Sequence, residues 1–304
     1  MLLREVRDIY RKELGGTHPP GEVDALFYRL LEHYLDLPRF VLGLEPGKML
    51  TREEEAPLFN ALSQLTAGQP VQYITGTARF LDMDLRVGPG ALIPRPETEE
   101  LVRWVLERHA ADLREGNILD IGTGSGCIAL GLAKSLSAAR VTALDISGEA
   151  LEVARENARH LGLDVRLVRA DILTPEGEWP ENILNPEGEW PGYDLIISNP
   201  PYIPRGQEGQ LAVHVRDHEP REALFAPDSD PLLYYRHIAG FSRRHLRGGG
   251  WLYVEIHEDF GAPTAELFRE AGLLEVSLKK DIFGKDRFLC GRSPDTNHKA
   301  RQNP

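Results

Sequence analysis

The sequence predicts an α/β chain in which a helical N-terminal part, roughly residues 1–75, precedes a sheet covered by helices. Three observations support this fold class. Apolar residues recur at helical spacing before residue 75, and strand-like runs alternate with helical runs from residue 94 to 291. A glycine-rich loop joins the first strand of this alternation to its helix. Such alternation is typical of a parallel sheet with helices packed on it.

The first 75 residues are expected to form a small helical bundle. Two apolar stripes recur at helical spacing: Leu3, Val6, Ile9 and Tyr10, and Leu26, Leu30, Leu31, Tyr34 and Leu35. Thr51 and Glu54 have the spacing of a capping box ahead of a further helix. Within that helix we expect Pro57 to cause a kink or to shift the start.

Residues 76–93 are predicted to be a β-hairpin connector between the bundle and the α/β domain. Pro96 then suits the first position of a helix, and the acids after it suit the positive first turn. We therefore divide the chain into a helical domain, the connector, an α/β domain at 94–291 and a polar tail at 292–304, which we expect to be disordered.

A glycine-rich loop follows the apolar run 117–119 and precedes a helical run that starts at Cys127. In this context glycines allow positive φ and close approach of a ligand to the backbone. The spacing Gly-x-Gly-x-Gly differs from that of dinucleotide folds, and the absence of a Lys-Ser/Thr end excludes a P-loop.

The acid that opens this loop favours a ligand with a cationic head, such as S-adenosylmethionine. Asp120 could take its ammonium group directly or through water. A glycine turn without a ligand is the alternative. The cofactor residues predicted here are Asp120, Gly122, Thr123, Gly124, Ser125 and Gly126.

Carboxylates also follow the next two predicted strands. Asp145 lies 19 residues after Gly126, where a carboxylate can accept both ribose hydroxyls of a nucleoside. Because NAD enzymes also bind the ribose with a carboxylate at this position, Asp145 indicates a nucleoside rather than one particular cofactor. We expect Asp171 near the exocyclic amine of an adenine and Ile172 against its ring. A turn or helix-cap role is equally open for Asp171.

Asn199-Pro200-Pro201-Tyr202 follows a β-branched run and is the most informative stretch of the chain. Two prolines in a row restrict the backbone and hold the Asn199 amide and the Pro200 carbonyl rigidly at a strand end. These two acceptors are aimed at one place, with Tyr202 as a flat wall. Such a site suits a planar NH2 group, so we predict its methylation. Asn199, Pro200 and Tyr202 are the catalytic candidates, Pro201 completes the substrate site, and Asn199 also borders the cofactor.

Composition argues against several other function classes. The chain has 35 basic and 47 acidic residues, a net charge of −12, whereas an enzyme acting on duplex DNA usually has a basic footprint. A local basic patch remains open as an alternative. Two cysteines are too few for a disulfide framework and suit a reducing cytosol. We find no tight His/Cys cluster for a metal, no transmembrane run and no signal peptide. We therefore expect a cytoplasmic protein without a metal.

A short internal repeat stands out in the second half of the chain. The hexapeptide Pro-Glu-Gly-Glu-Trp-Pro occurs at residues 175–180 and again at 186–191. We interpret the duplication as an inert extension of the loop before the strand that leads to Asn199.

The chain resembles the release-factor glutamine methyltransferases, the HemK/PrmC family of class I S-adenosylmethionine enzymes, over residues 3–291. The segments that carry the resemblance are 69–76, 92–99, 120–126, 198–203, 218–224 and 280–287. Asn-Pro-Pro-Tyr is shared with DNA adenine-N6 methyltransferases, whereas its combination with Ile-Pro-Arg-Pro-Glu-Thr-Glu is specific to this family. The chain departs from the family pattern at His257, at Pro231 and in the tryptophan repeat.

This resemblance implies a Rossmann-like methyltransferase domain and a defined reaction. The substrate would be the glutamine in the Gly-Gly-Gln motif of class 1 peptide-chain release factors. The products would be N5-methylglutamine and S-adenosyl-L-homocysteine. We expect the helical domain to recognise the release factor, although a purely stabilising role is the alternative. No membrane and no nucleic-acid substrate are expected.

Two other functions remain open from the residues. A DNA adenine-N6 methyltransferase would use the same acceptors on a flipped base; the acidic balance and the absence of an evident target-recognition domain argue against it. A cofactor-sensing or ribosome-associated binding module would keep Asp145 and the glycine loop but would have no use for Asn199.

Overall fold

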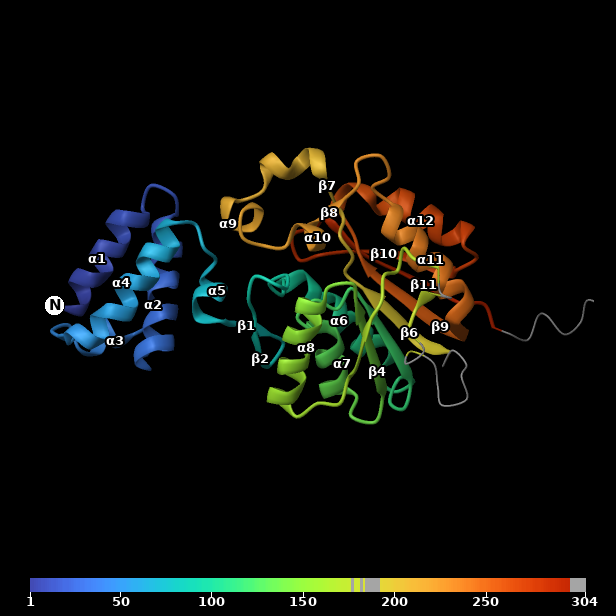
Figure 1. Ribbon diagram of the computed structural model, residues 1–304, viewed down its shortest axis with the longest axis horizontal. Helices are drawn as coiled ribbons and strands as arrows, with labels where there is room; N and C mark the ends of the chain where they lie inside the picture. The colour runs from blue at the N-terminus through green and yellow to red at the C-terminus, as the bar shows by residue number, and fades with distance from the viewer. Residues whose placement is uncertain (176–177, 181–182, 184–191, 296–304) are drawn as a thin grey trace, which may run out of the picture. The chain divides into compact units, whose positions relative to one another are not determined.

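The computed structural model describes residues 1–175, 178–180, 183 and 192–295 (Figure 1). The chain divides into two compact units. The helical unit comprises Met1–Thr77 and Ala212–His218, and the sheet unit comprises Ala78–Leu211 and Glu219–Pro304. The predicted α/β fold, with a helical N-terminal bundle and a β-hairpin after it, is confirmed.

The helical unit is built on the apolar stripes that the sequence shows. Its helices are α1 (Leu3–Leu14), α2 (Pro20–Leu35), α3 (Val41–Leu44), α4 (Arg52–Thr66), α5 (Val71–Thr75) and α9 (Val213–Arg216). Thr51 and Glu54 form the expected capping box, with Thr51 N–H donating to Glu54 Oε2 at 2.8 Å. Pro57 lies inside α4 without shifting its start. Tyr10 packs edge-on against Phe27, with ring centroids 5.1 Å apart, in the buried core.

One short segment of the helical unit comes from far along the sequence. Residues 212–218, which include α9, interrupt the sheet unit but belong to the compact helical unit. Gly68 lies close to this segment, since a Cβ built there would be 3.5 Å from Val213 Cγ1 and 3.6 Å from His218 Nε2. The helical unit is therefore larger than the predicted domain of residues 1–75.

The sheet unit contains a seven-stranded sheet within the described residues, in the order β10-β11-β9-β6-β3-β4-β5. Its strands are β3 (Asn117–Ile121), β4 (Arg140–Asp145), β5 (Arg166–Arg169), β6 (Tyr193–Ser198), β9 (Leu246–Glu255), β10 (Leu274–Lys280) and β11 (Asp286–Arg292). A two-residue pair, β7 (Ile203–Pro204) with β8 (Phe225–Ala226), lies outside it. The chain runs outward from β3 to β5 and then continues on the other side of β3 with β6, which makes a topological switch point between β3 and β6.

Helices cover both faces of this sheet (Figure 1). One face packs against α6 (Pro96–His109), α7 (Cys127–Ser135) and α8 (Gly148–Leu161), and the other against α11 (Leu233–His245) and α12 (Gly261–Glu270). Strands β3 and β6 lie in the middle of the sheet and are covered on both sides, which explains why apolar residues follow one another directly at 118–119 and 195–197. The sheet unit also has short helices among its described residues, including η3 (Arg205–Gln210), α10 (Arg221–Leu224) and η4 (Glu258–Phe260).

The sheet differs from the expected parallel arrangement at one edge. Strand β11 pairs antiparallel with both β9 and β10. The turn of residues 281–285 between β10 and β11 is too short for the crossover that a parallel pair needs, so these strands form a hairpin.

The two ends of the sheet unit also differ in detail from the predicted boundaries. Strands β1 (Thr77–Phe80) and β2 (Met83–Arg86) form the two-stranded hairpin, which packs on the face that carries α6 and α7. Arg292 ends β11, and Ser293 exchanges backbone hydrogen bonds with Gly249 and Gly250. The predicted tail therefore begins too early at 292, and its residues 296–304 lie outside the described residues.

Candidate active site

The sheet register brings the predicted site segments to one edge. Ile121 of β3 is the register partner of Leu144 in β4 and of Ser198 in β6. Ser198 Oγ also donates to the Ile121 carbonyl oxygen at 2.7 Å. Because the three strands are parallel, the glycine loop, Asp145 and Asn199 follow neighbouring strand ends. Ligands of open α/β sheets bind at such carboxyl ends, next to the switch point.

The three loop glycines have two different roles. All of them have positive φ: 73° at Gly122, 55° at Gly124 and 84° at Gly126. A Cβ at Gly122 or Gly124 would meet nothing within 4 Å, so these positions face open space that a ligand can use. A Cβ at Gly126 would be 3.0 Å from Leu130 Cδ1 and 3.2 Å from Ala154 Cβ. Gly126 therefore allows α7 and α8 to pack closely.

Asp120 lies beneath the loop with its side chain buried. Its Oδ2 accepts hydrogen bonds from Thr123 Oγ1 at 2.6 Å and from Ala129 N–H at 3.2 Å. Its Oδ1 is buried and has no partner among the described residues. Burial raises the pKa of Asp120 to about 7, although both hydrogen bonds act to lower it. Thr123 thus holds the loop, and Ser125, also buried, belongs to its interior.

Asp145 connects the end of β4 to the glycine loop. Its Oδ2 accepts from Gly124 N–H at 2.9 Å and its Oδ1 accepts from Ser147 N–H at 2.9 Å. Burial raises its pKa, opposed by these backbone hydrogen bonds. Each oxygen keeps a lone pair, which leaves the carboxylate able to accept ribose hydroxyls. The next residue, Ile146, is 53% exposed and offers an apolar surface beside this carboxylate.

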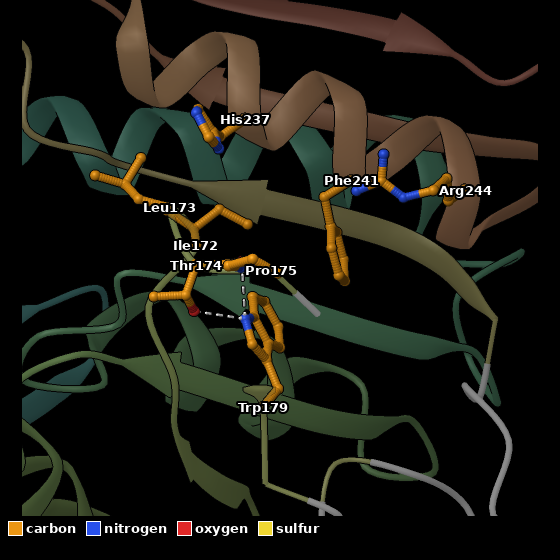
Figure 2. A pocket seen from close by; sticks show the side chains of 8 residues that line it. All are labelled: Ile172, Leu173, Thr174, Pro175, Trp179, His237, Phe241 and Arg244. Atoms are coloured by element: carbon orange, nitrogen blue, oxygen red, sulfur yellow. Dashed lines mark hydrogen bonds between the residues drawn. The ribbon is translucent and has the colours of Figure 1, made fainter. Parts of the chain in front are cut away.

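Asp171 makes the hydrogen bonds of a turn, which is one of the two roles that the sequence left open. Its Oδ1 accepts from Leu173 N–H at 2.9 Å, and its carbonyl oxygen accepts from Thr174 N–H at 3.1 Å. Ile172 lines a cavity of about 400 Å3 (Figure 2). The cavity walls are Ile172, Leu173, Thr174, Pro175, Trp179, His237, Phe241 and Arg244. Gly122, Asp145 and Asn199 do not line it, so the position of Ile172 gives no support to adenine contact.

The first copy of the hexapeptide repeat contributes to the core of the sheet unit. Trp179 is 8% exposed, its ring stacks on Phe241 at 5.4 Å, and its Nε1 donates to Thr174 Oγ1 at 3.1 Å (Figure 2). The interpretation as an inert extension is therefore wrong for this copy. The second copy, at 186–191, lies outside the described residues.

A hydrogen-bond network surrounds the Asn-Pro-Pro-Tyr segment. Asn199 Nδ2 donates to Thr98 Oγ1 at 3.1 Å, and Thr98 Oγ1 donates to Glu255 Oε2 at 2.7 Å. The Tyr202 hydroxyl donates to Glu255 Oε1 at 3.0 Å. Pro200 is buried, whereas Asn199, Pro201 and Tyr202 are partly exposed. The network orients the polar groups that we predicted to hold an NH2 group.

Burial also changes the acid-base properties of this network. It raises the pKa of Glu255 to about 7, although Thr98, Tyr202 and Arg287 act to lower it. Burial, followed by the negative charge of Glu255, raises the pKa of Tyr202 well above its usual value. Tyr202 is therefore a neutral hydrogen-bond donor near pH 7.

An ion pair joins two further segments that carry the resemblance to the family. Arg95 Nη2 lies 2.5 Å from Glu219 Oε1, and Ile93 N–H donates to Glu219 Oε2 at 3.1 Å. Glu219 is 4% exposed, and a buried carboxylate of this kind needs such partners. This contact holds the start of α6, and with it Thr98, in place.

Comparison with known proteins decides the family. Residues 15–76 match the PrmC N-terminal domain, and residues 100–216 match the methyltransferase small domain. The release factor glutamine methyltransferase of Flavobacterium psychrophilum is 38% identical over 291 residues, covering 95% of this chain and 98% of the relative. The chain belongs to the release factor glutamine methyltransferase family. The enzyme of that name from Bacteroides thetaiotaomicron is 40% identical over 279 residues, with 92% and 96% covered.

A solved structure supports the fold independently. A methyltransferase from Pyrococcus furiosus has a TM-score of 0.50 and 20% identity, covering 80% of this chain and all of its own. At this identity the likeness concerns the fold alone. The resemblance to the HemK/PrmC family is confirmed, and membership of a methyltransferase family implies the use of S-adenosylmethionine.

Three residues of this site were missing from our sequence-based prediction: Thr98, Ile146 and Glu255. Thr98 lies in the specific Ile-Pro-Arg-Pro-Glu-Thr-Glu segment, and Glu255 is an acid at the end of an apolar strand. These were available signals, although neither shows that the two residues meet. Ile146 directly follows Asp145, and its exposure is visible only in the structure.

Cys127 and His257 lie outside this hydrogen-bond network. Burial raises the pKa of Cys127 to about 12, so it is a poor nucleophile. His257, a departure from the family pattern, shares a hydrogen bond of 3.1 Å with Gln207 Oε1, and its ring lies edge-on to Tyr202. Within the described residues, no group of three or more His, Cys, Asp or Glu side chains is placed to hold a metal, and no helix is long and apolar enough to cross a membrane.

Proposed function

We propose that this chain transfers a methyl group from S-adenosylmethionine to the N5 amide nitrogen of the glutamine in the Gly-Gly-Gln motif of class 1 peptide-chain release factors. Family membership supports the reaction. The observation that carries the site is the pairing of Ile121 with Ser198, because it puts the glycine loop and Asn199 at neighbouring strand ends. The DNA adenine-N6 alternative loses its support, since two relatives that match over more than nine-tenths of the chain are release factor glutamine methyltransferases.

The residues around the glycine loop fit the cofactor. When bound, S-adenosylmethionine supplies a methyl group on a sulfonium centre, and S-adenosyl-L-homocysteine is the product. Gly122 and Gly124 would leave room for its backbone contacts. Asp145 would accept the ribose hydroxyls, and Ile146 would offer apolar surface to the base. The unpartnered buried Oδ1 of Asp120 supplies negative charge beneath the loop for the ammonium group.

The Asn-Pro-Pro-Tyr segment would hold the substrate amide. An amide nitrogen is a poor nucleophile because its lone pair is delocalised into the carbonyl group. Asn199 Oδ1 and the Pro200 carbonyl oxygen would accept its two hydrogens, and Tyr202 would pack on the amide plane. Orientation of this kind supplies at most about 7–11 kcal/mol of a barrier. Once it has accepted the methyl group, the nitrogen would lose a proton to water, so no strong base is needed.

The partner in this proposal is a folded release factor. Residues 1–75 carry no motif with chemistry of their own, and we assign them, with the packed segment 212–218, to recognition of the factor. No membrane and no nucleic-acid substrate enter the proposal, and it places the enzyme in the cytoplasm beside its substrate.

A methylation assay tests the proposal. Purified enzyme and isotopically labelled S-adenosylmethionine are incubated with an intact release factor, with the same factor carrying glutamate in place of the motif glutamine, and with duplex DNA. We expect label in the first sample alone, located by mass spectrometry on the glutamine side chain. Label in the glutamate variant or in DNA would contradict the assignment.

A further inference from the structure

Glu255 is a buried acid for which the proposed reaction has no direct use. It ends β9 with its side chain inside the sheet unit, 1% exposed. Its two oxygens accept hydrogen bonds from two different hydroxyls, those of Thr98 and Tyr202. Thr98 in turn accepts from Asn199. A single carboxylate thus stands behind both side chains that face the substrate amide in the proposed function.

Hydrogen-bond chemistry gives this chain of contacts a direction. An ionised carboxylate can only accept, and a threonine hydroxyl has one hydrogen to donate. When Thr98 donates that hydrogen to Glu255, its oxygen can only accept from Asn199. The Asn199 side chain must then turn its Nδ2 toward Thr98, and its Oδ1 is left for another donor. The orientation with Oδ1 toward Thr98 would place two acceptors against each other.

Stability gives no reason for a carboxylate at this position. Moving a charge into the interior is costly, and a well-packed apolar residue at such a site is often as stable or more stable. The charge is offset in part by Arg287. Burial acts to lower the pKa of Arg287, but Tyr202, the hydrogen bond to Asp281 and Glu255 together raise it. Arg287 also donates to Asp281 Oδ2 at 3.3 Å and lies 3.6 Å from Glu258 Oε2, so its charge is shared among three acids. Because burying Glu255 is costly, we infer that this acid has a role in the site around Asn199.

We propose that Glu255 is a positioning residue, which through Thr98 makes Asn199 present its Oδ1, and through Tyr202 fixes the tyrosine ring, toward the amide to be methylated. This proposal rests on the proposed function, because it assumes that Asn199 accepts a hydrogen of the substrate amide. It assigns to Glu255 no contact with substrate or cofactor.

The direction of the hydrogen bonds between Asn199, Thr98 and Glu255 depends on the charge of Glu255. A protonated carboxyl group has a hydrogen to donate, which the Thr98 oxygen can accept. Thr98 would then be free to donate its own hydrogen to Asn199, which favours the reversed amide. The ionisable groups that act on this carboxyl group from neighbouring elements are Glu97, Cys127, Tyr202, Tyr235 and Arg287. Because burial raises the pKa of Glu255 to about 7, turnover is expected to fall as the pH drops below about 7.

A matched pair of substitutions at Thr98 tests the direction. Thr98→Val keeps the shape of the side chain and removes the hydroxyl, whereas Thr98→Ser keeps the hydroxyl. We expect the valine variant to lose about 10- to 100-fold in kcat with intact release factor, the range in which misplaced catalytic groups act. The serine variant should stay within about threefold of wild type. S-adenosyl-L-homocysteine affinity, measured by calorimetry, should be unchanged in both.

Glu255→Gln tests the acid itself. It keeps the volume but presents one acceptor and one donor, so we expect a similar loss of kcat and no further loss as the pH is lowered. Asp120 also has a pKa of about 7, but its loss of charge should appear in cofactor affinity and not in kcat. The two acids can therefore be separated in one pH series.

The outcomes distinguish this proposal from the proposed function. If wild-type enzyme does not methylate release factor, the proposed function fails and the variants play no part in that result. If wild type is active and Glu255→Gln retains full kcat, or Thr98→Val equals Thr98→Ser, the positioning role is wrong. Should Glu255→Gln fail to fold, which loss of cofactor binding would reveal, the Thr98 pair decides alone.

Discussion

The backbone N–H of Gly124 donates a hydrogen bond to Asp145 Oδ2 at 2.9 Å. This contact joins the loop after β3 to the acid at the end of β4, two segments that the sequence assigns to different parts of one ligand. The same carboxylate also accepts from Ser147 N–H at its other oxygen. Asp145 therefore shapes the glycine loop as well as offering lone pairs to a ribose.

Replacing Asp145 should weaken cofactor binding, and alanine should weaken it more than asparagine. Asp145→Ala removes the acceptors of Gly124 and Ser147 together with the ribose contacts, and hydrogen bonds to a charged partner are worth about 1.5–3 kcal/mol. We expect S-adenosyl-L-homocysteine affinity to fall about 10- to 100-fold, with a smaller loss in Asp145→Asn, which keeps one acceptor oxygen. Calorimetry measures both, with the exposed Asp164→Ala as control. Unchanged affinity in Asp145→Ala would mean that the glycine loop binds the cofactor alone.

Asn199→Ala should separate turnover from cofactor binding. Its amide is held by Thr98 and is expected to orient the substrate nitrogen, so its loss should lower kcat by about 10²–10³-fold, the effect of removing one positioned polar group. S-adenosyl-L-homocysteine affinity should change little, because Asn199 is at most a border of that site. Steady-state assays with release factor and calorimetry on the same preparation provide the two readings. A variant with near-normal kcat would remove Asn199 from the mechanism.

The sequence predicted those parts of the site that are encoded locally. The glycine loop, Asp145 and Asn199 each stand directly after an apolar strand, and parallel strands bring their carboxyl ends to one edge. This is why the fold class and the gathering of these segments were visible before the structure.

The network behind Asn199 was not predictable in the same way. Thr98, Asn199 and Glu255 come from α6, the loop after β6 and the end of β9, and no local pattern shows that their side chains meet. Asp171 could be a ligand or a turn residue from sequence, and the hydrogen bond from Leu173 favours the turn. The burial of Trp179 was not expected, because a repeat in a loop gives no sign that one of its tryptophans stacks on Phe241.

The titration of Glu255 should also make the stability of the chain depend on pH. Its pKa is raised from 4.5 to about 7 in the folded chain, so the native state binds more protons than the unfolded state between these values. Through this group, the free energy of unfolding of the wild-type chain should therefore decrease as the pH rises from about 4.5 to about 7. Glu255→Gln does not titrate. Its stability relative to wild type should rise by about 3 kcal/mol over this interval.

Urea unfolding followed by tryptophan fluorescence can measure this difference. Among the described residues, Trp104, Trp179 and Trp251 all lie in the sheet unit, so their fluorescence reports on the unit that contains Glu255. Asp120 titrates in both proteins and cancels in the comparison. A stability difference that stays constant between pH 4.5 and pH 8 would show that Glu255 does not have a raised pKa.

The last prediction concerns the helical unit, which we propose as the recognition module. A short peptide with the Gly-Gly-Gln motif can bind only near Asn199, whereas an intact release factor can also bury surface against helices. We therefore expect the enzyme to methylate the intact factor far better than the peptide. Deleting residues 1–75 should remove this preference while S-adenosyl-L-homocysteine still binds.

The deletion of residues 1–75 needs a control for folding. Segment 212–218 belongs to the helical unit and packs near Gly68, so the truncation also removes its partners. Cofactor affinity and tryptophan fluorescence, both properties of the sheet unit, show whether the shortened enzyme is folded. Turnover of the peptide then serves as the reference, because it needs only the site around Asn199. If the folded, truncated enzyme still prefers intact factor by the same ratio, recognition lies in the sheet unit, and the helices only stabilise the chain.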